Sequence, residues 1–233
     1  MAVGALPPLL ELVKRRRSLR KDYIEALDEM GTCLQAQKQY DKAERYYLRA
    51  LAVAKKELKQ ERSSSLSSSL LNNYAELLRK TERSVAALPF YKQAIALDRA
   101  RSDINSQLLT EHNLALALDD VGRTNEAAQL FRSIQKVSRK KKLWEHYVRA
   151  WLALADSAWI HGERNTALRR YRKVRSLCAQ YRLSELFLHV ALNEAQLLQQ
   201  MDRNESALAL LNPLRNQFLL SKHCLALFLT LGR

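Results

Sequence analysis

Apolar residues recur along this chain at the spacing of helices, and the whole pattern repeats about every forty residues. Five segments align on one alanine, with intervals of 44, 40, 40 and 40 residues. A large apolar residue follows each alanine by four positions, which places both on one helix face. A small residue twelve positions before the alanine lets a preceding helix approach closely. The alanines are Ala43, Ala87, Ala127, Ala167 and Ala207, the large residues are Tyr47, Tyr91, Phe131, Tyr171 and Leu211, and the small residues are Gly31, Ala75, Ala115, Ala155 and Ala195.

Each repeating unit is predicted to be a helical hairpin, because a short polar stretch separates two segments with helical periodicity. Such a hairpin cannot bury its apolar face alone and must stack on its neighbours. Asp41, Thr124 and Asn165 are the expected N-caps of three second helices. The pattern therefore predicts an all-α fold. Its expected parts are an N-terminal tail with a basic cluster at 1–18, an array at 19–220 with repeats at approximately 19–62, 63–102, 103–141, 142–181 and 182–220, and a capping helix or the start of a truncated sixth repeat at 221–233.

One repeat carries a family resemblance. Residues 27–31 (LDEMG), with Tyr40, Ala43, Tyr47 and Ala50, resemble the pattern of the tetratricopeptide repeat (TPR). The period near 40 exceeds the usual ~34 residues and is similar to the long repeats of kinesin light chains and related peptide-binding adaptors. The resemblance implies a right-handed α-solenoid of stacked antiparallel hairpins, a TPR-like superhelix with five repeats plus a final helix. It also implies a noncatalytic scaffold in which the first helix of each hairpin lines a concave groove.

Two prolines depart from the family pattern. Pro89 and Pro213 fall inside the second helices of repeats two and five. A proline inside a helix removes one backbone donor, so we expect these two helices to be kinked or irregular.

The column two residues before the small residue is rich in asparagine, with Asn73, Asn113 and Asn193. An asparagine amide both donates and accepts hydrogen bonds, which suits pairing with the main chain of an extended peptide. The alternative is that each amide bonds to a neighbouring helix of the same protein. The segment 71–75 (LNNYA) also resembles the groove-lining Leu-Asn-Asn-Leu-Ala of kinesin light chains. The other candidate groove residues are Asn72, His112, the cations Arg79, Lys80 and Arg149 that are candidates for gripping a carboxylate, and Trp159, which either pads a turn or anchors a ligand.

Positive charge is concentrated in one quarter of the chain. The chain has 39 Lys and Arg against 24 Asp and Glu, a net charge of +15, and residues 121–180 carry +10 of it. The helix dipole favours cations near helix C-termini, which explains the first of two clusters in part but not five charges on one second helix. An acidic protein surface or a nucleic-acid backbone is the predicted partner of this basic rear face. The clusters are Arg139, Lys140, Lys141 and Lys142, and Arg169, Arg170, Arg172, Lys173 and Arg175.

The sequence offers little support for catalysis, metals or cofactors. The five histidines lack metal-ligand spacing, the three cysteines lie far apart, and no nucleotide-binding or GxSxG motif is present. We therefore expect a protein that is not an enzyme and that uses no metal or cofactor. No apolar run approaches the ~20 residues of a membrane-spanning helix. The odd cysteine count favours a reducing compartment, cytoplasmic or nuclear, with organelle import left open.

The leading interpretation is a noncatalytic adaptor that binds a peptide or helical segment of a partner protein in its groove and docks on an acidic assembly through its basic face. Two alternatives stay open. One is a factor associated with RNA or DNA that uses region 121–180, and the other is a structural subunit of a larger complex. Binding to phosphates weakens steeply with salt, which separates the nucleic-acid alternative from groove binding.

Overall fold

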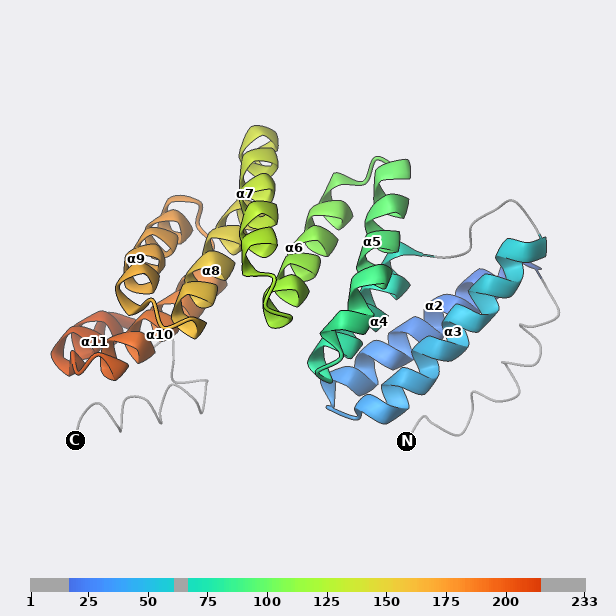
Figure 1. Cartoon of the computed structure of the whole chain (residues 1–233), viewed down its shortest axis with the longest axis horizontal. Coiled ribbons are helices and arrows are strands. Elements are labelled where there is room, and N and C mark those ends of the chain that lie inside the picture. Colours follow the sequence, from blue (N-terminus) through green and yellow to red (C-terminus); the bar gives the residue numbers. More distant parts are fainter. Residues whose placement is uncertain (1–16, 61–66, 215–233) are drawn as a thin grey trace. The chain divides into compact units, whose positions relative to one another are not determined.

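The computed structural model describes residues 17–60 and 67–214, and the predicted final helix and most of the predicted N-terminal tail lie outside them (Figure 1). The described residues form helices and turns without a strand, which confirms the all-α fold class. No helix among them is long and apolar enough to span a membrane. The helices are α2 (Arg17–Ala36), α3 (Tyr40–Gln60), α4 (Ser68–Lys80), α5 (Ser84–Ala100), α6 (Ile104–Asp120), α7 (Thr124–Lys141), α8 (Trp144–Ile160), α9 (Arg164–Gln180), α10 (Ser184–Gln200) and α11 (Asn204–Leu211), followed by a 3₁₀ turn at Asn212–Leu214.

The chain divides into two compact units after Ala127, and α7 spans this boundary. In the first unit, each of α2 and α4 packs on the second helix of its hairpin, and α5 packs on α6. The first helices α2 and α4 are also neighbours, as are α4 and α6. In the second unit, α9 packs on both α8 and α10, and α10 packs on α11. First helices of adjacent repeats therefore lie close enough in the first unit for their side chains to interact.

The aligned columns of the sequence form the cores of both units. Tyr47, Tyr91 and Tyr171 are fully buried, as are the alanines four residues before them. Gly31 shows why the small column is small, because a Cβ atom there would lie 2.6 Å from the ring of Tyr47. Burying rings of this size supplies a large share of the stability of a helical hairpin.

The hydroxyls of Tyr47, Tyr91 and Tyr171 each find a polar partner one residue after the small residue of their own repeat. This position is Thr32 for Tyr47 (3.2 Å), Glu76 for Tyr91 (3.1 Å) and Asp156 for Tyr171 (2.5 Å). Where the third repeat has Phe131 in place of tyrosine, the same position is Leu116. In these four repeats the two columns match in polarity, as expected from the cost of burying an unpaired hydroxyl, whereas in the fifth repeat Leu211 goes with the polar Gln196.

Eight of the turns that join consecutive described helices contain one residue in the left-handed backbone region, just after the preceding helix ends. The next residue donates its N–H to the carbonyl five positions earlier, with N···O distances of 2.8–3.0 Å, which defines a Schellman cap. Glycine occupies only two of these positions. The residues are Lys38, Glu82, Ser102, Lys142, Arg182 and Asp202, with φ between 56° and 61°, and Gly122 and Gly162, with φ of 78° and 79°.

These turns explain why the predicted N-caps are wrong. Asp41 and Asn165 lie in the first turns of α3 and α9, and Thr124 is the first residue of α7. The Schellman turn is so short that the carbonyls of Gln39, Arg123 and Glu163 already accept the first bonds of those helices. Side-chain caps occur instead at Ser67 and Asp103, which accept from the backbone N–H groups of Leu70 and Ser106.

The two prolines have different outcomes. Pro89 is exposed, and α5 continues through it from Ser84 to Ala100. Pro213 lies in the 3₁₀ turn that follows the end of α11 at Leu211. The expected irregularity therefore appears at Pro213.

Candidate functional site

Asparagines on the first helices of the first unit form a connected row. The Nδ2 of Asn73 on α4 donates to Oδ1 of Asp28 on α2 (3.0 Å), and the Nδ2 of Asn113 on α6 donates to Oδ1 of Asn72 on α4 (2.9 Å). Asn72 Nδ2 lies 3.5 Å from Asn73 Oδ1, a weak link between the two pairs. His112 lies half-buried next to Asn113 on α6. The row holds each amide in a fixed orientation while part of its hydrogen-bonding capacity stays unused.

Burial raises the pKa of Asp28, and the hydrogen bond from Asn73 offsets this only in part. The nearby carboxylates of Glu29 and Glu25 act in the same direction as burial. Asn73 is therefore one partner of a partly desolvated carboxyl group as well as a candidate ligand contact.

Arg79 is held by two carboxylates. Its Nε and Nη2 donate to Glu76 (2.9 and 3.0 Å), and its Nη1 donates to Asp120 on α6 (3.3 Å). Burial would raise the pKa of Glu76, but the hydrogen bonds and charge of Arg79 outweigh it and the pKa lies below its ordinary value. The Nζ of the exposed Lys80 lies 3.7 Å from Glu76. These contacts reduce the charge that Arg79 and Lys80 offer to a ligand carboxylate.

In the second unit, the positions equivalent to Arg79 and Asp120 hold neutral side chains that are also hydrogen-bonded to each other. The fourth residue after the small residue is Arg79 in the first unit and Trp159 in the second. Arg79 bonds to Asp120, whereas Trp159 Nε1 donates to Oε1 of Gln200 (2.8 Å), which occupies the same position as Asp120 in its own repeat. The indole ring also contacts the buried ring of Tyr171 edge-on, with centroids 6.1 Å apart. Trp159 therefore joins α8 to α10 and is only half-buried.

Asp156 of α8 accepts two hydrogen bonds and has no Arg or Lys paired with it among the described residues, although His189 lies close enough to act on its charge. Tyr171 donates its hydroxyl to Oδ1 (2.5 Å), and Asn193 of α10 donates its Nδ2 to the same atom (3.3 Å). Burial raises the pKa of Asp156, and the hydrogen bond from Tyr171, the charge of His189 and the hydrogen bond from Asn193 offset this in part. Arg149, on the same helix, is exposed and pairs with Glu145 (2.9 Å).

The basic residues of α9 are largely used inside the second unit. Arg170 Nη1 donates to the carbonyl oxygen of Leu154 (2.6 Å), and Arg175 Nε donates to Glu194 (2.9 Å), whose exposed fraction is 2%. Arg172 lies 3.5 Å from the other oxygen of Glu194. Lys173 Nζ lies 4.7 Å from the ring centre of Trp151, and Arg169 is exposed with its Nη2 3.5 Å from Thr166. A buried glutamate and a cation–π contact thus account for much of a cluster that the sequence presents as surface charge.

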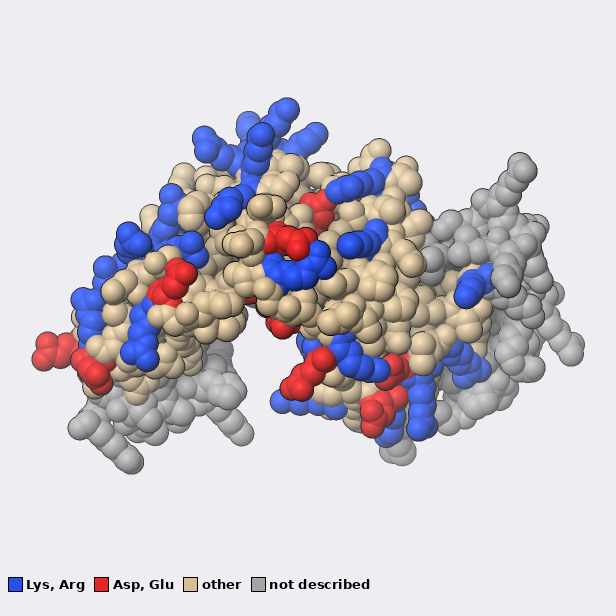
Figure 2. All heavy atoms as spheres, viewed as in Figure 1, with Lys and Arg blue, Asp and Glu red and all other residues tan. Residues whose placement is uncertain are grey.

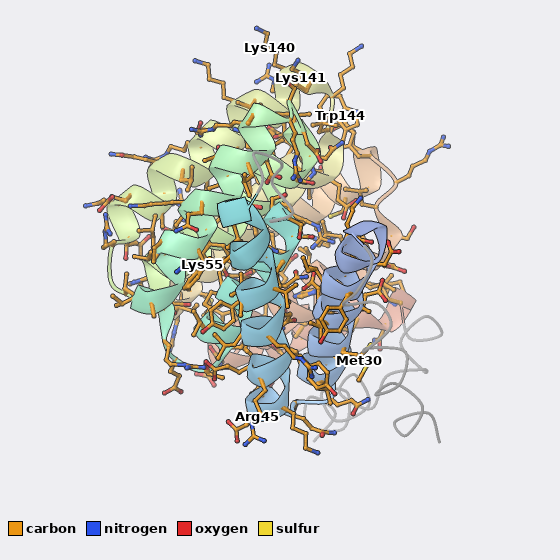
Figure 3. The ribbon with its side chains drawn as sticks, turned by 90° about the vertical axis from the view of Figure 1, so that its right-hand side faces the viewer. Met30, Arg45, Lys55, Lys140, Lys141 and Trp144 are labelled. Carbon is orange, nitrogen blue, oxygen red and sulfur yellow. The ribbon has the colours of Figure 1, made fainter. Side chains whose placement is uncertain are left out.

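The other basic cluster projects into solvent. Arg139, Lys140, Lys141 and Lys142 are all exposed at the C-terminal end of α7, where Figure 2 shows Lys and Arg side chains gathered. Lys140 and Lys141 point away from the ribbon (Figure 3). Lys142 also provides the left-handed residue of the turn into α8.

Groups suited to metal binding or nucleophilic chemistry are sparse. Within the described residues, no three His, Cys, Asp or Glu side chains are arranged to hold a metal ion. Cys33 is exposed, and burial raises the pKa of the Cys178 thiol to about 11, which keeps it protonated at neutral pH.

The hairpin array defines the class of protein. Residues 22–100 match the tetratricopeptide repeat family. A kinesin light chain-related structure from Podosopora anserina with nearly identical TPR-like repeats is similar at 21% identity and a TM-score of 0.63, over 84% of this chain and 94% of that one. Residues 22–100 therefore match the TPR family, and the described residues share the helical-hairpin fold of the kinesin light chain-related repeats, in agreement with the resemblance seen in the sequence.

Two further solved structures share the fold and are complexes. A Rap protein complexed with Competence and Sporulation Factor has 13% identity and a TM-score of 0.66, over 88% of this chain and 56% of that one. NprR in complex with its cognate peptide NprX has 15% identity and a TM-score of 0.66, over 96% of this chain and 63% of that one. No curated protein is significantly similar in sequence.

Proposed function

We propose that the protein is a noncatalytic adaptor that binds an extended or helical segment of a partner protein along the first helices of its first unit. The observation that carries this proposal is the row of amides on α2, α4 and α6. Asn113 uses one N–H toward Asn72, which leaves its Oδ1 and second N–H to pair with a peptide main chain. Asn73 likewise keeps one N–H beyond its bond to Asp28.

The solved TPR structures support this assignment. NprR is described with its cognate peptide, and the Rap protein with Competence and Sporulation Factor. Kinesin light chains and related adaptors, which the repeats resemble, are also interaction proteins. A rigid array that fixes amide orientation before binding lowers the entropic cost of holding an extended segment.

The test begins with peptides selected from a random phage-displayed library on the full chain. Their affinities are then measured by calorimetry for the Asn73→Ala and Asn113→Ala variants. Each change leaves polar groups of the peptide unpaired, so we expect a loss of roughly 1–3 kcal/mol per variant, nearly additive in the double variant. Asn105→Ala is the matched control, because Asn105 is exposed on α6 outside the row.

Asn73→Ala also removes a donor from Asp28, so thermal melting of each variant must accompany the titration. A variant that melts normally and binds selected peptides as tightly as the unchanged chain contradicts the proposal. Peptide binding that is lost on charge reversal at Arg169 and Arg172, but kept in both asparagine variants, replaces groove binding with an electrostatic mechanism.

The basic rear face is the second part of the proposal. We propose that exposed Arg139, Lys140, Lys141 and Lys142 dock the adaptor on an acidic surface. The nucleic-acid alternative uses the same residues. It requires affinity for a single-stranded oligonucleotide that falls log-linearly and steeply with salt. The exposed Cys33 thiol is consistent with the reducing compartment expected for a cytoplasmic or nuclear adaptor.

A further inference from the structure

A pocket of about 490 Å³ lies in the second unit, apart from the amide row. Its volume is within the usual range for ligand sites. Helix α7 contributes its cationic wall, and α8 contributes an aromatic wall. The lining residues are Arg132, Gln135, Lys136, Arg139 and Lys140 on α7, and Tyr147 and Trp151 on α8.

Four cations of the pocket form one face of α7. Their spacing of four, three and one residues places Arg132, Lys136, Arg139 and Lys140 on the same side of the helix. All four are exposed, no carboxylate lines the pocket, and none of the four pairs with a described carboxylate. Lys173, which does not line the pocket, lies over the ring of Trp151 with its Nζ 4.7 Å from the ring centre. A hollow lined by one sign of charge focuses its field on a bound ion of the opposite sign.

Two neutral donors of the same pocket are buried without partners. Gln135 Nε2 and Trp151 Nε1 are inaccessible to solvent and have no hydrogen-bond partner in the part of the chain that the structure describes. Buried donors are nearly always paired, so two unpaired donors in one pocket point to a ligand that accepts hydrogen bonds. The pocket thus combines cations with unsatisfied N–H groups.

We propose that this pocket binds the phosphate group of a phosphorylated side chain in a partner protein. The donors outnumber what one carboxylate can accept, because a carboxylate has two oxygens and a single charge. A phosphomonoester has three terminal oxygens and a charge near −2, and therefore matches several converging donors. Tyr147 and Trp151 supply apolar surface for the remainder of the modified side chain.

The geometry favours a monoester over a nucleic-acid backbone. Each phosphodiester carries one charge, and successive diesters are spread along a strand, which suits a row of separate cations. Here the cations line one hollow, and two of its lining side chains, Gln135 and Trp151, carry buried N–H groups without partners among the described residues. This inference adds a pocket that shares Arg139 and Lys140 with the proposed basic docking face, and it does not depend on the amide row.

The test uses the full chain and calorimetry at near-physiological ionic strength. The probe is a short alanine peptide with a central phosphotyrosine, compared with the same peptide carrying tyrosine or glutamate, with phenyl phosphate, and with a short single-stranded oligonucleotide. We expect the phosphopeptide to bind at least about tenfold more tightly than every other probe, because it alone offers both the dianion and a peptide chain.

Four variants locate the binding. Gln135→Leu and Trp151→Phe each remove one unpaired donor while keeping most of the side-chain volume, and we expect each to weaken phosphopeptide binding by about tenfold. Their melting temperatures should stay unchanged or rise, since a buried unpaired donor is lost. Arg132→Gln should also weaken binding, whereas Arg169→Gln removes the same charge from an exposed position outside the pocket and should leave it unchanged.

Several outcomes overturn the proposal. Equal binding of the phosphorylated and unphosphorylated peptides removes the phosphate requirement. Phenyl phosphate that binds as tightly as the phosphopeptide assigns the pocket to a small phosphomonoester, and an oligonucleotide that binds more tightly and needs Gln135 assigns it to nucleic acid. Asn73→Ala and Asn113→Ala should leave phosphopeptide binding unchanged, so the failure of either proposal is visible without the other.

Discussion

Glu76 in the first unit and Asp156 in the second occupy the same position of their repeats and have opposite protonation behaviour. Each accepts the hydroxyl of the buried tyrosine fifteen residues later. Beside Glu76 stands Arg79, which lowers the pKa of Glu76, whereas the position of Arg79 is taken by Trp159 beside Asp156, whose pKa burial raises. The same repeat position therefore holds a carboxyl group whose pKa is lowered where an arginine bonds to it and raised where burial is the largest effect.

The largest expected effect tests what the two units share. Tyr91→Ala and Tyr171→Ala each remove a fully buried ring and should each cost about 3–5 kcal/mol of unfolding free energy. Because repeats contact mainly their neighbours, hydrogen exchange should rise first within the unit that carries the change. Loss of protection along the whole chain from either variant would contradict this local response.

Replacing Glu76 or Asp156 by its amide should change the free energy of unfolding differently in the two units. Glu76→Gln removes the charge that pairs with Arg79 and should destabilise the protein by roughly 1–3 kcal/mol. Asp156→Asn keeps an oxygen that accepts from Tyr171 and Asn193 and removes a charge that burial disfavours more than the two donors and His189 favour it, so it should be neutral or stabilising at pH 7. Urea denaturation measures both. A destabilising Asp156→Asn of similar size would mean that the charge itself is needed there.

Acidification should act oppositely on the two regions. The stabilising contribution of Glu76 is present above its ordinary pKa of 4.5 and is lost as pH falls through the lowered folded-state value. The pKa of Asp156 is raised, so its stabilising contribution is present below its ordinary value of 3.8 and is lost as pH rises through the folded-state value. Hydrogen exchange of α4 and α5 should therefore increase relative to that of α8 and α9 as pH falls below about 4.5. In Glu76→Gln this divergence should shrink.

The smallest expected effect concerns turns, where the two units should behave alike. Glu82 and Arg182 adopt φ values of 61° and 59°, which glycine adopts without the steric cost of a Cβ atom. Glu82→Gly and Arg182→Gly should each stabilise the protein by up to about 1 kcal/mol, the gain being reduced by the greater freedom of glycine in the unfolded chain. Gly122→Ala should destabilise it by a similar amount. Thermal melting measures all three, and a gain in one unit only would show that side-chain contacts of Glu82 or Arg182 matter more than the backbone.

The helical fold could be predicted from the sequence because its core positions are apolar, regularly spaced and repeated five times. The asparagine column was also visible, but its partners were not, because Asp28 and Asp156 lie in different columns and only packing brings each to its amide. The starts of three second helices were missed by one or two residues, because in each Schellman turn a carbonyl that precedes the predicted cap already accepts the first helical hydrogen bond.

The basic cluster of α9 shows the limit of charge counting. Five cations in seven residues indicate a charged surface, yet the buried Glu194 that pairs with Arg172 and Arg175 lies on the next helix. The pocket on α7 was missed for the converse reason. Arg132, Lys136, Arg139 and Lys140 share a helix face, a signal that the sequence contains, but the unpaired nitrogens of Gln135 and Trp151 are known only from packing.

The left-handed turns bear on how such an array can change during evolution. Their geometry comes from main-chain hydrogen bonds, so lysine, glutamate, serine, arginine and aspartate all serve in place of glycine. Mutational drift at these tips therefore has little effect on the register of the helices. A duplication of any forty-residue stretch carries a working turn with it, so the gene can gain or lose hairpins without a new connecting sequence being selected at the same time.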